Sequence, residues 1–114
     1  MKKIYRIKKN EDIKLVLDRK KSAGNKNYII YIMKNSEAKN FRVAMSVSKK
    51  IGNAVVRNRQ KRLIRQVFIS NKDKINLYEI FVIARSNVVN LTYNEVEQNI
   101  LYLLKKLNVL IEEN

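Results

Sequence analysis

One segment, GNAVVRNRQKRLIRQVF at residues 52–68, restricts the possible fold of this chain more than any other. Its apolar residues recur every three or four positions, which predicts an amphipathic helix with one face packed on a core. The nine positions from Arg57 to Arg65 carry five Lys or Arg residues, and all of them except Arg57 fall with Asn58 on the other side of the helix. The fold must therefore provide an apolar layer beneath this helix and leave its basic face exposed.

Three further segments predict that this layer is a β-sheet. Residues 28–33 are β-branched and aromatic, residues 41–47 alternate between apolar and polar, and residues 79–84 form a short apolar run. Alternation in the first strand separates Tyr28, Ile30 and Ile32 from a second face with Ile29, Tyr31 and Met33. The second strand would turn Phe41, Val43, Met45 and Val47 toward the core. Its open face would carry Arg42, Ala44 and Ser46.

Helical periodicity occurs in two other places. A first helix is expected from Asn10, a candidate N-cap, with Ile13, Val16 and Leu17 on its apolar face. The turn-forming residues 20–27 are expected to end it. A last helix is expected from residue 92 to about residue 110. With residue 53 as the N-cap of the basic helix, the element order is αββαβα, which predicts one α+β sandwich domain over residues 1–114.

The composition excludes several kinds of catalytic site. The chain has no His and no Cys, so it has no imidazole base, no Ser-His or Cys-His nucleophile pair and no thiolate or imidazole zinc site. Its adjacent carboxylates, such as Glu11 with Asp12, would point in different directions on a helix and form no obvious acid/base or two-metal site. A nuclease or hydrolase that acts by itself is therefore not expected.

The charge points to an acidic partner. The net charge is +15, and no acidic residue occurs between Glu37 and Asp73 to neutralise the basic helix. Like charges on one helix face repel, and phosphates lying across that face would remove the repulsion. Nucleic acid is the first expected partner and an anionic membrane the second, and no apolar run approaches the length of a membrane span. We expect a cytoplasmic protein.

Residues 46–66, SVSKKIGNAVVRNRQKRLIRQ, resemble the signature of the bacterial ribonuclease P protein component. The segments RIKKNEDI, NYIIYIM and FVIAR also lie where that family has its first helix, first strand and third strand, so the resemblance extends from about residue 4 to residue 108. It implies a ribosomal-protein-like fold with a mixed sheet and a left-handed βαβ crossover. Most βαβ crossovers are right-handed.

The resemblance also implies a function. In that family an RNA subunit catalyses the removal of the 5′ leader from precursor tRNA, with Mg²⁺ ions held mainly by the RNA. The protein is a subunit of this endoribonuclease that tightens substrate binding and helps to organise the metal-bound active site. It is not expected to be catalytic alone. A chain without a nucleophile or base is consistent with that division.

Two groups of residues match the family's RNA-binding positions. The group expected to contact the catalytic RNA is Lys49, Lys50, Arg57, Asn58, Arg59, Lys61, Arg62 and Arg65. The group expected to form a cleft for the single-stranded leader is Ile13, Leu17, Ile29 and Tyr31. Ile13 and Leu17 stand where the family often has phenylalanine, so this helix would offer apolar packing rather than base stacking. Tyr31 could also be ordinary half-buried sheet packing.

Two other classes of binding protein fit parts of the pattern. A ribosomal or general RNA-binding protein would share the size, charge and α+β composition. A helix-turn-helix DNA-binding protein would also carry a basic helix. The basic helix here lacks a short preceding helix joined by a tight turn, and DNA is therefore not an expected partner.

Overall fold

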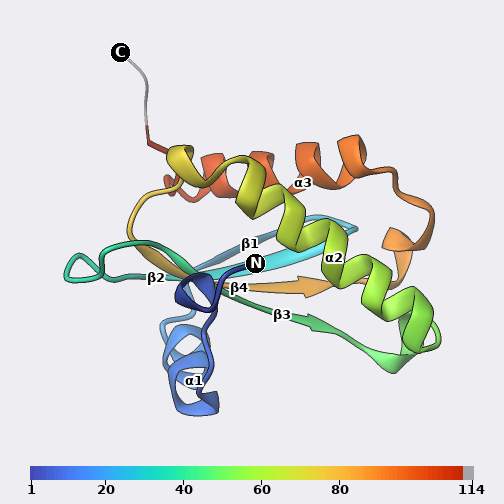
Figure 1. Ribbon diagram of the computed structural model, residues 1–114, viewed down its shortest axis with the longest axis horizontal. Coiled ribbons are helices and arrows are strands. Elements are labelled where there is room, and N and C mark those ends of the chain that lie inside the picture. The colour runs from blue at the N-terminus through green and yellow to red at the C-terminus, as the bar shows by residue number, and fades with distance from the viewer. Residues whose placement is uncertain (112–114) are drawn as a thin grey trace.

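The computed structural model describes residues 1–111 and contains three α-helices and four strands within that range. The helices are α1 (Asn10–Asp18), α2 (Ala54–Ser70) and α3 (Tyr93–Lys106), and the strands are β1 (Ser22–Gly24), β2 (Tyr28–Lys34), β3 (Arg42–Val47) and β4 (Tyr78–Ala84). The strands form one mixed sheet in the order β1-β2-β4-β3 (Figure 1). Strands β1, β2 and β4 pair antiparallel, and β3 runs parallel to β4.

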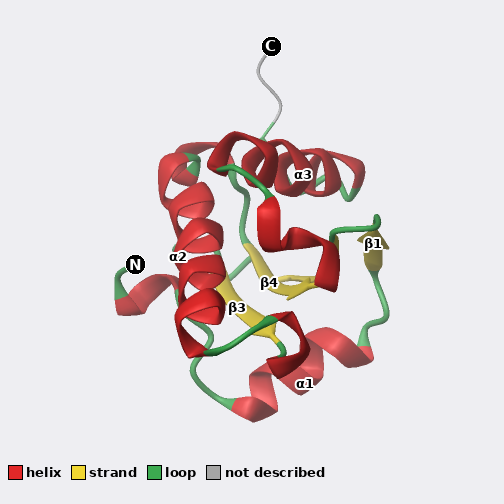
Figure 2. Ribbon diagram, turned by 90° about the vertical axis from the view of Figure 1, so that its right-hand side faces the viewer, coloured by secondary structure: helices red, strands yellow, loops and turns green. Residues whose placement is uncertain are grey.

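The sheet separates two helical layers. Helices α2 and α3 cover one face, and α1 lies across the other (Figures 1 and 2). Along β2 the side chains of Tyr28, Ile30 and Ile32 are fully buried beneath α2 and α3, as the alternation predicted. Phe41 is buried in the same core, where its ring lies 5.9 Å from that of Phe68 on α2. The core therefore occupies one side of the sheet and leaves the other side partly open.

The connection from β3 through α2 to β4 is a left-handed crossover, as the family resemblance implied. Both strands point to the right in Figure 1, α2 returns above them, and β4 lies behind β3 (Figures 1 and 2). About 98% of connections between two parallel strands in proteins are right-handed. This chirality places α2 over the outer edge of the sheet, where one side of the helix remains in solvent.

Three predicted boundaries were wrong. Residues 20–27, expected to be only a turn, contain strand β1, which pairs with the edge of β2 through Ser22, Ala23 and Gly24. Lys9 rather than Asn10 is the N-cap of α1, with no side-chain capping bond. Helix α3 ends at Lys106 and not near residue 110, because Asn108 has a φ of 60° that turns the chain away.

Within residues 1–111, no helix combines the length and the apolar character that crossing a membrane requires.

Candidate nucleic-acid interface

Helix α2 is fixed in one orientation by its cap and its apolar face. The Asn53 side chain accepts a hydrogen bond from the Val56 amide at 3.1 Å, which confirms it as the N-cap. Ile64, Val67 and Phe68 are fully buried against the sheet and α3. The opposite face must then point to solvent, because the period of the helix separates the two sets of residues.

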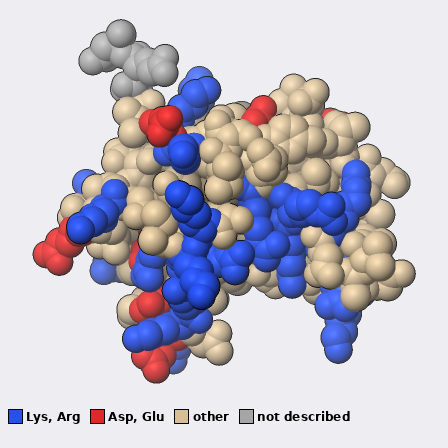
Figure 3. Space-filling model, in the orientation of Figure 1, with Lys and Arg blue, Asp and Glu red and all other residues tan. Residues whose placement is uncertain are grey.

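The predicted RNA-binding residues of α2 are all at least partly accessible. Arg59, Arg62 and Asn58 are exposed, and Arg57, Lys61 and Arg65 are half-buried. The Nε atom of Arg57 is buried and has no hydrogen-bond partner among residues 1–111. Figure 3 shows the Lys and Arg side chains as a nearly continuous band that follows α2 and extends toward α1. Both ion pairs found among residues 1–111 involve Arg42, so none neutralises α2. The helix therefore presents a charged face that lacks acidic neighbours in the described part of the chain.

Lys49 and Lys50 extend this face beyond the start of α2. They lie exposed in a single 3₁₀ turn, Lys49–Ile51, whose Ile51 side chain anchors it in the core. Gly52 follows, and a Cβ added there would lie 2.9 Å from two Val56 atoms. The absence of a side chain at this position is thus what lets the basic turn approach the first turn of α2 so closely.

The open face of the sheet carries the residues predicted for the leader cleft. Ile29 and Tyr31 are half-buried on the side opposite the core, as alternation along β2 indicated. The register places Phe81 of β4 beside Tyr31, and Ala44 of β3 beside Phe81. Phe81 was not among the predicted site residues. Alternation along the strand was the sequence signal, because Phe81 lies between Ile80 and Val82 and therefore points to the opposite face from these two buried residues.

Helix α1 covers part of this face. Val16 is fully buried under the helix, while Ile13 and Leu17 are half-buried at its sides. A pocket of about 220 Å³ lies beside Ile13 and is also lined by Ala44 of β3 and by Lys61 and Arg65 of α2. Met1, Arg6, Ile7, Val43 and Met45 complete its walls. The pocket joins the basic face of α2 to the first helix, so the two predicted surfaces meet rather than lie on separate sides.

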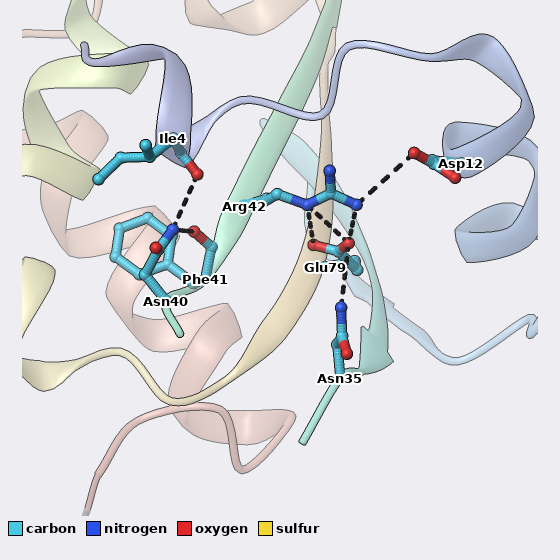
Figure 4. A network of polar contacts seen from close by, with 7 residues as sticks. All are labelled: Ile4, Asp12, Asn35, Asn40, Phe41, Arg42 and Glu79. Carbon is cyan, nitrogen blue, oxygen red and sulfur yellow. Dashed lines mark hydrogen bonds and ion pairs between the residues drawn. The ribbon is translucent and has the colours of Figure 1, made fainter. Parts of the chain in front are cut away.

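Arg42, on the open face of β3, has a structural role. Arg42 Nε donates to Glu79 Oε1 at 2.8 Å and to Oε2 at 3.1 Å, and its Nη2 also contacts Glu79 and lies 3.6 Å from Asp12 (Figure 4). Asn35 donates to the same carboxylate at 3.4 Å. Glu79 is only 1% exposed, so Arg42 balances a buried charge. The hydrogen bond to Glu79 raises the pKa of Arg42.

Potential metal ligands do not converge in the described part of the chain. Residues 1–111 contain no cluster of three or more His, Cys, Asp or Glu side chains that could hold a metal ion.

Comparisons with known proteins agree with the resemblance seen in the sequence. The ribonuclease P family model matches residues 1–108. The ribonuclease P protein component of Listeria innocua is 48% identical over 92% of this chain and 89% of its own length. Two solved structures of ribonuclease P proteins also superimpose on this chain. The Staphylococcus aureus protein has a TM-score of 0.86 at 38% identity, covering 94% of this chain and 98% of its own. The Thermotoga maritima protein, in complex with 1-(4-fluorophenyl)-2-thiourea, has a TM-score of 0.81 at 29% identity, covering 94% and 100%.

Proposed function

The chain belongs to the ribonuclease P protein family, whose members are subunits of that endoribonuclease, and from this we propose how its two surfaces divide the work. The basic face of α2 binds the catalytic RNA subunit. The open face of the sheet beside α1 binds the 5′ leader of precursor tRNA. The observation that supports the proposal is the pocket in which Ile13 meets Lys61 and Arg65, because there the proposed leader surface lies directly beside the proposed RNA-binding face.

The charges on α2 suit a folded RNA. Arginine guanidinium groups form two parallel hydrogen bonds with a phosphate, whereas lysines act as point charges. The residues proposed to contact the catalytic RNA are Lys49, Lys50, Arg57, Asn58, Arg59, Lys61, Arg62 and Arg65. Asn58 both donates and accepts, so it can contact a sugar or a base edge. Each phosphate bound would release counterions, which makes assembly strongly dependent on salt.

The open sheet face suits a single strand. Bases of single-stranded RNA stack on aromatic rings, and the register brings Tyr31 and Phe81 side by side on this face. Ile13 and Leu17 of α1 and Ile29 of β2 add apolar walls without a π-face. Arg42 is not part of the proposed leader surface, because its guanidinium already pairs with Glu79. The two neighbouring rings are therefore the proposed stacking platform for the leader.

The catalytic chemistry is proposed to reside in the RNA subunit. Mg²⁺ ions bound mainly by that RNA would supply the activated water and the charge stabilisation for cleavage. The carboxylates of residues 1–111 are too dispersed to hold such an ion by themselves. What the side chains of this protein contribute is positive charge against RNA phosphates and an apolar face for the leader. We place this complex in the cytoplasm, with neither DNA nor a membrane as a partner.

The test is which RNA this protein selects. The tagged protein should co-purify with a large structured RNA that cleaves precursor tRNA when reconstituted with it in the presence of Mg²⁺. A protein that recovered only ribosomal RNA fragments, and left cleavage unchanged on addition, would be a ribosomal or general RNA-binding factor instead. A control with Lys105→Gln and Lys106→Gln on α3, which change the same kind of charge on another helix, should behave as the wild type.

A further inference from the structure

A second and larger pocket lies at the C-terminal end of α1. Its volume is about 540 Å³, and its polar walls come from Arg19, Lys21, Lys34, Ser36 and Tyr78. Arg19 is the C-cap of α1, Lys21 directly precedes β1, and Lys34 is the last residue of β2. The α1–β1 connection thus brings two basic side chains and the end of β2 a third to the same concave surface.

These three basic side chains have no acidic partner in the described part of the chain. All three are exposed, none forms an ion pair within residues 1–111, and no acidic residue lines the pocket. The C-terminal end of a helix attracts cations, which accounts for Arg19 without any ligand. This attraction does not account for Lys34, because Lys34 is at the end of β2 and not on the helix. The pocket is therefore a site of concentrated positive charge beyond what the helix itself favours.

The remaining lining residues suit RNA rather than a simple ion. Tyr78 is half-buried and lies opposite Lys34 in the pairing of β2 with β4. The exposed hydroxyl of Ser36 can donate to a phosphate oxygen, and Met33 adds an apolar side chain. Basic side chains next to an aromatic ring are the usual composition of a site for single-stranded nucleic acid.

The pocket lies at the edge of the sheet, next to the surface proposed for the leader. Met33 shares the open face with Tyr31, whereas Lys34 alternates to the other side of β2 with Ile32, so the pocket borders the end of that face. Arg19 follows Leu17 by two residues at the end of α1. The pocket beside Ile13 is at the α2 side, where the catalytic RNA would lie. A strand that enters there, passes Tyr31 and turns around the edge of the sheet would reach Arg19 and Lys34 with its more distant nucleotides.

We propose that this pocket binds the phosphate backbone of the outer leader nucleotides, farther from the cleavage site than those stacked on the open sheet face. The proposal rests on the proposed function and adds a second contact to it. Long leaders would then bind more tightly than leaders that only fill the sheet face.

The experiment measures precursor tRNA affinity of the reconstituted holoenzyme with leaders of one, about 5 and about 15 nucleotides, lengths that span common single-strand site sizes. The Lys21→Gln, Lys34→Gln double variant should lose about threefold or more in affinity for the longest leader, the order expected for two exposed ion pairs. Its salt slope for that leader should fall by about 1.4, from two lost contacts to single-stranded phosphates. The charge reversals Lys21→Glu and Lys34→Glu should enlarge the loss, and Lys105→Gln with Lys106→Gln should cause none.

The three leader lengths distinguish a failure of this inference from a failure of the proposed function on which it rests. Wild-type holoenzyme that binds leaders of one and about 5 nucleotides equally would contradict leader binding on the sheet face. Wild-type holoenzyme that gains affinity up to about 5 nucleotides and then no more would overturn the pocket alone. An equal loss at every leader length, together with weaker assembly of the RNA subunit, would overturn it too and would assign the pocket to the catalytic RNA.

Discussion

Replacing Tyr31 separates a stacking role from a packing role. Tyr31 is half-buried, so Tyr31→Ala removes both packing and a π-face, whereas Tyr31→Leu keeps an apolar side chain and removes only the π-face. We expect both variants to weaken precursor tRNA binding by the holoenzyme by ~1–3 kcal/mol, the usual contribution of one stacked base, or about 5- to 150-fold in Kd. Tyr31→Phe should bind as the wild type.

The position of Phe81 places the expected loss at the lower end of that range. Because Phe81 lies directly beside Tyr31 in the register, it can keep part of the stacking when Tyr31 is lost. The effects of Tyr31→Leu and Phe81→Leu should therefore be non-additive, with the double variant losing more than the sum of the two single losses. Simple addition would show that each ring holds its own base.

The assay compares precursor tRNA with mature tRNA, which lacks the leader. Affinity for mature tRNA should hardly change, and a precursor trimmed to a one-nucleotide leader should lose most of the difference between variant and wild type. Equal losses for precursor and mature tRNA, accompanied by a lower Tm for Tyr31→Leu, would refute the reasoning. Tyr31 would then be sheet packing, and the leader would lie elsewhere.

Four further outcomes are expected. Arg59→Ala or Arg62→Ala should weaken assembly with the RNA subunit and make the salt slope shallower by ~1 per lost phosphate contact; an unchanged slope with slower cleavage would place these residues on the reacting strand. Arg42→Ala should lower the free energy of unfolding by about 3 kcal/mol in urea titrations, because it leaves the Glu79 carboxylate buried without its cation. A loss below about 1 kcal/mol would mean that the pair contributes no more than an exposed ion pair. Tyr28→Phe should stabilise the protein or leave it unchanged, because the Tyr28 hydroxyl is buried with no hydrogen-bond partner among residues 1–111. Burial raises the pKa of Tyr28 above its ordinary 10.0, so the wild type should lose stability relative to Tyr28→Phe as the pH rises above that value, and parallel pH profiles would contradict this. Added sulfate should increase the far-UV circular dichroism of the free protein at low salt, since the net charge of +15 opposes compaction; an unchanged spectrum would show that the fold tolerates its own charge.

Local signals explain what the sequence could predict. The apolar period of α2, the Asn53 cap and the alternation along β2 and β3 each depend on residues close together in the chain. They were enough to place the basic face and the open sheet face. Asn53 could be recognised because an N-cap needs only a side-chain oxygen next to the first helical turn.

Features that depend on distant partners could not be predicted. Gln60 is fully buried on α2, where its amide donates to the Val88 carbonyl at 3.3 Å, a contact that no local pattern indicates. The pairing of Arg42 with Glu79 requires the register between β3 and β4. Strand β1 has only three small residues and exists because β2 offers it an edge. The hand of the crossover likewise has no local signal.

The strand order has a consequence for synthesis of the chain. Strand β4 lies between β2 and β3, which share no hydrogen bonds with each other, yet it is the last strand to leave the ribosome. Until residue 84 has emerged, only the short β1–β2 pair can form, and β2 and β3 keep unpaired edges that invite association with other chains. Sheet formation is therefore a single late step with long-range contacts, which slows folding compared with a chain whose neighbouring strands follow one another in sequence.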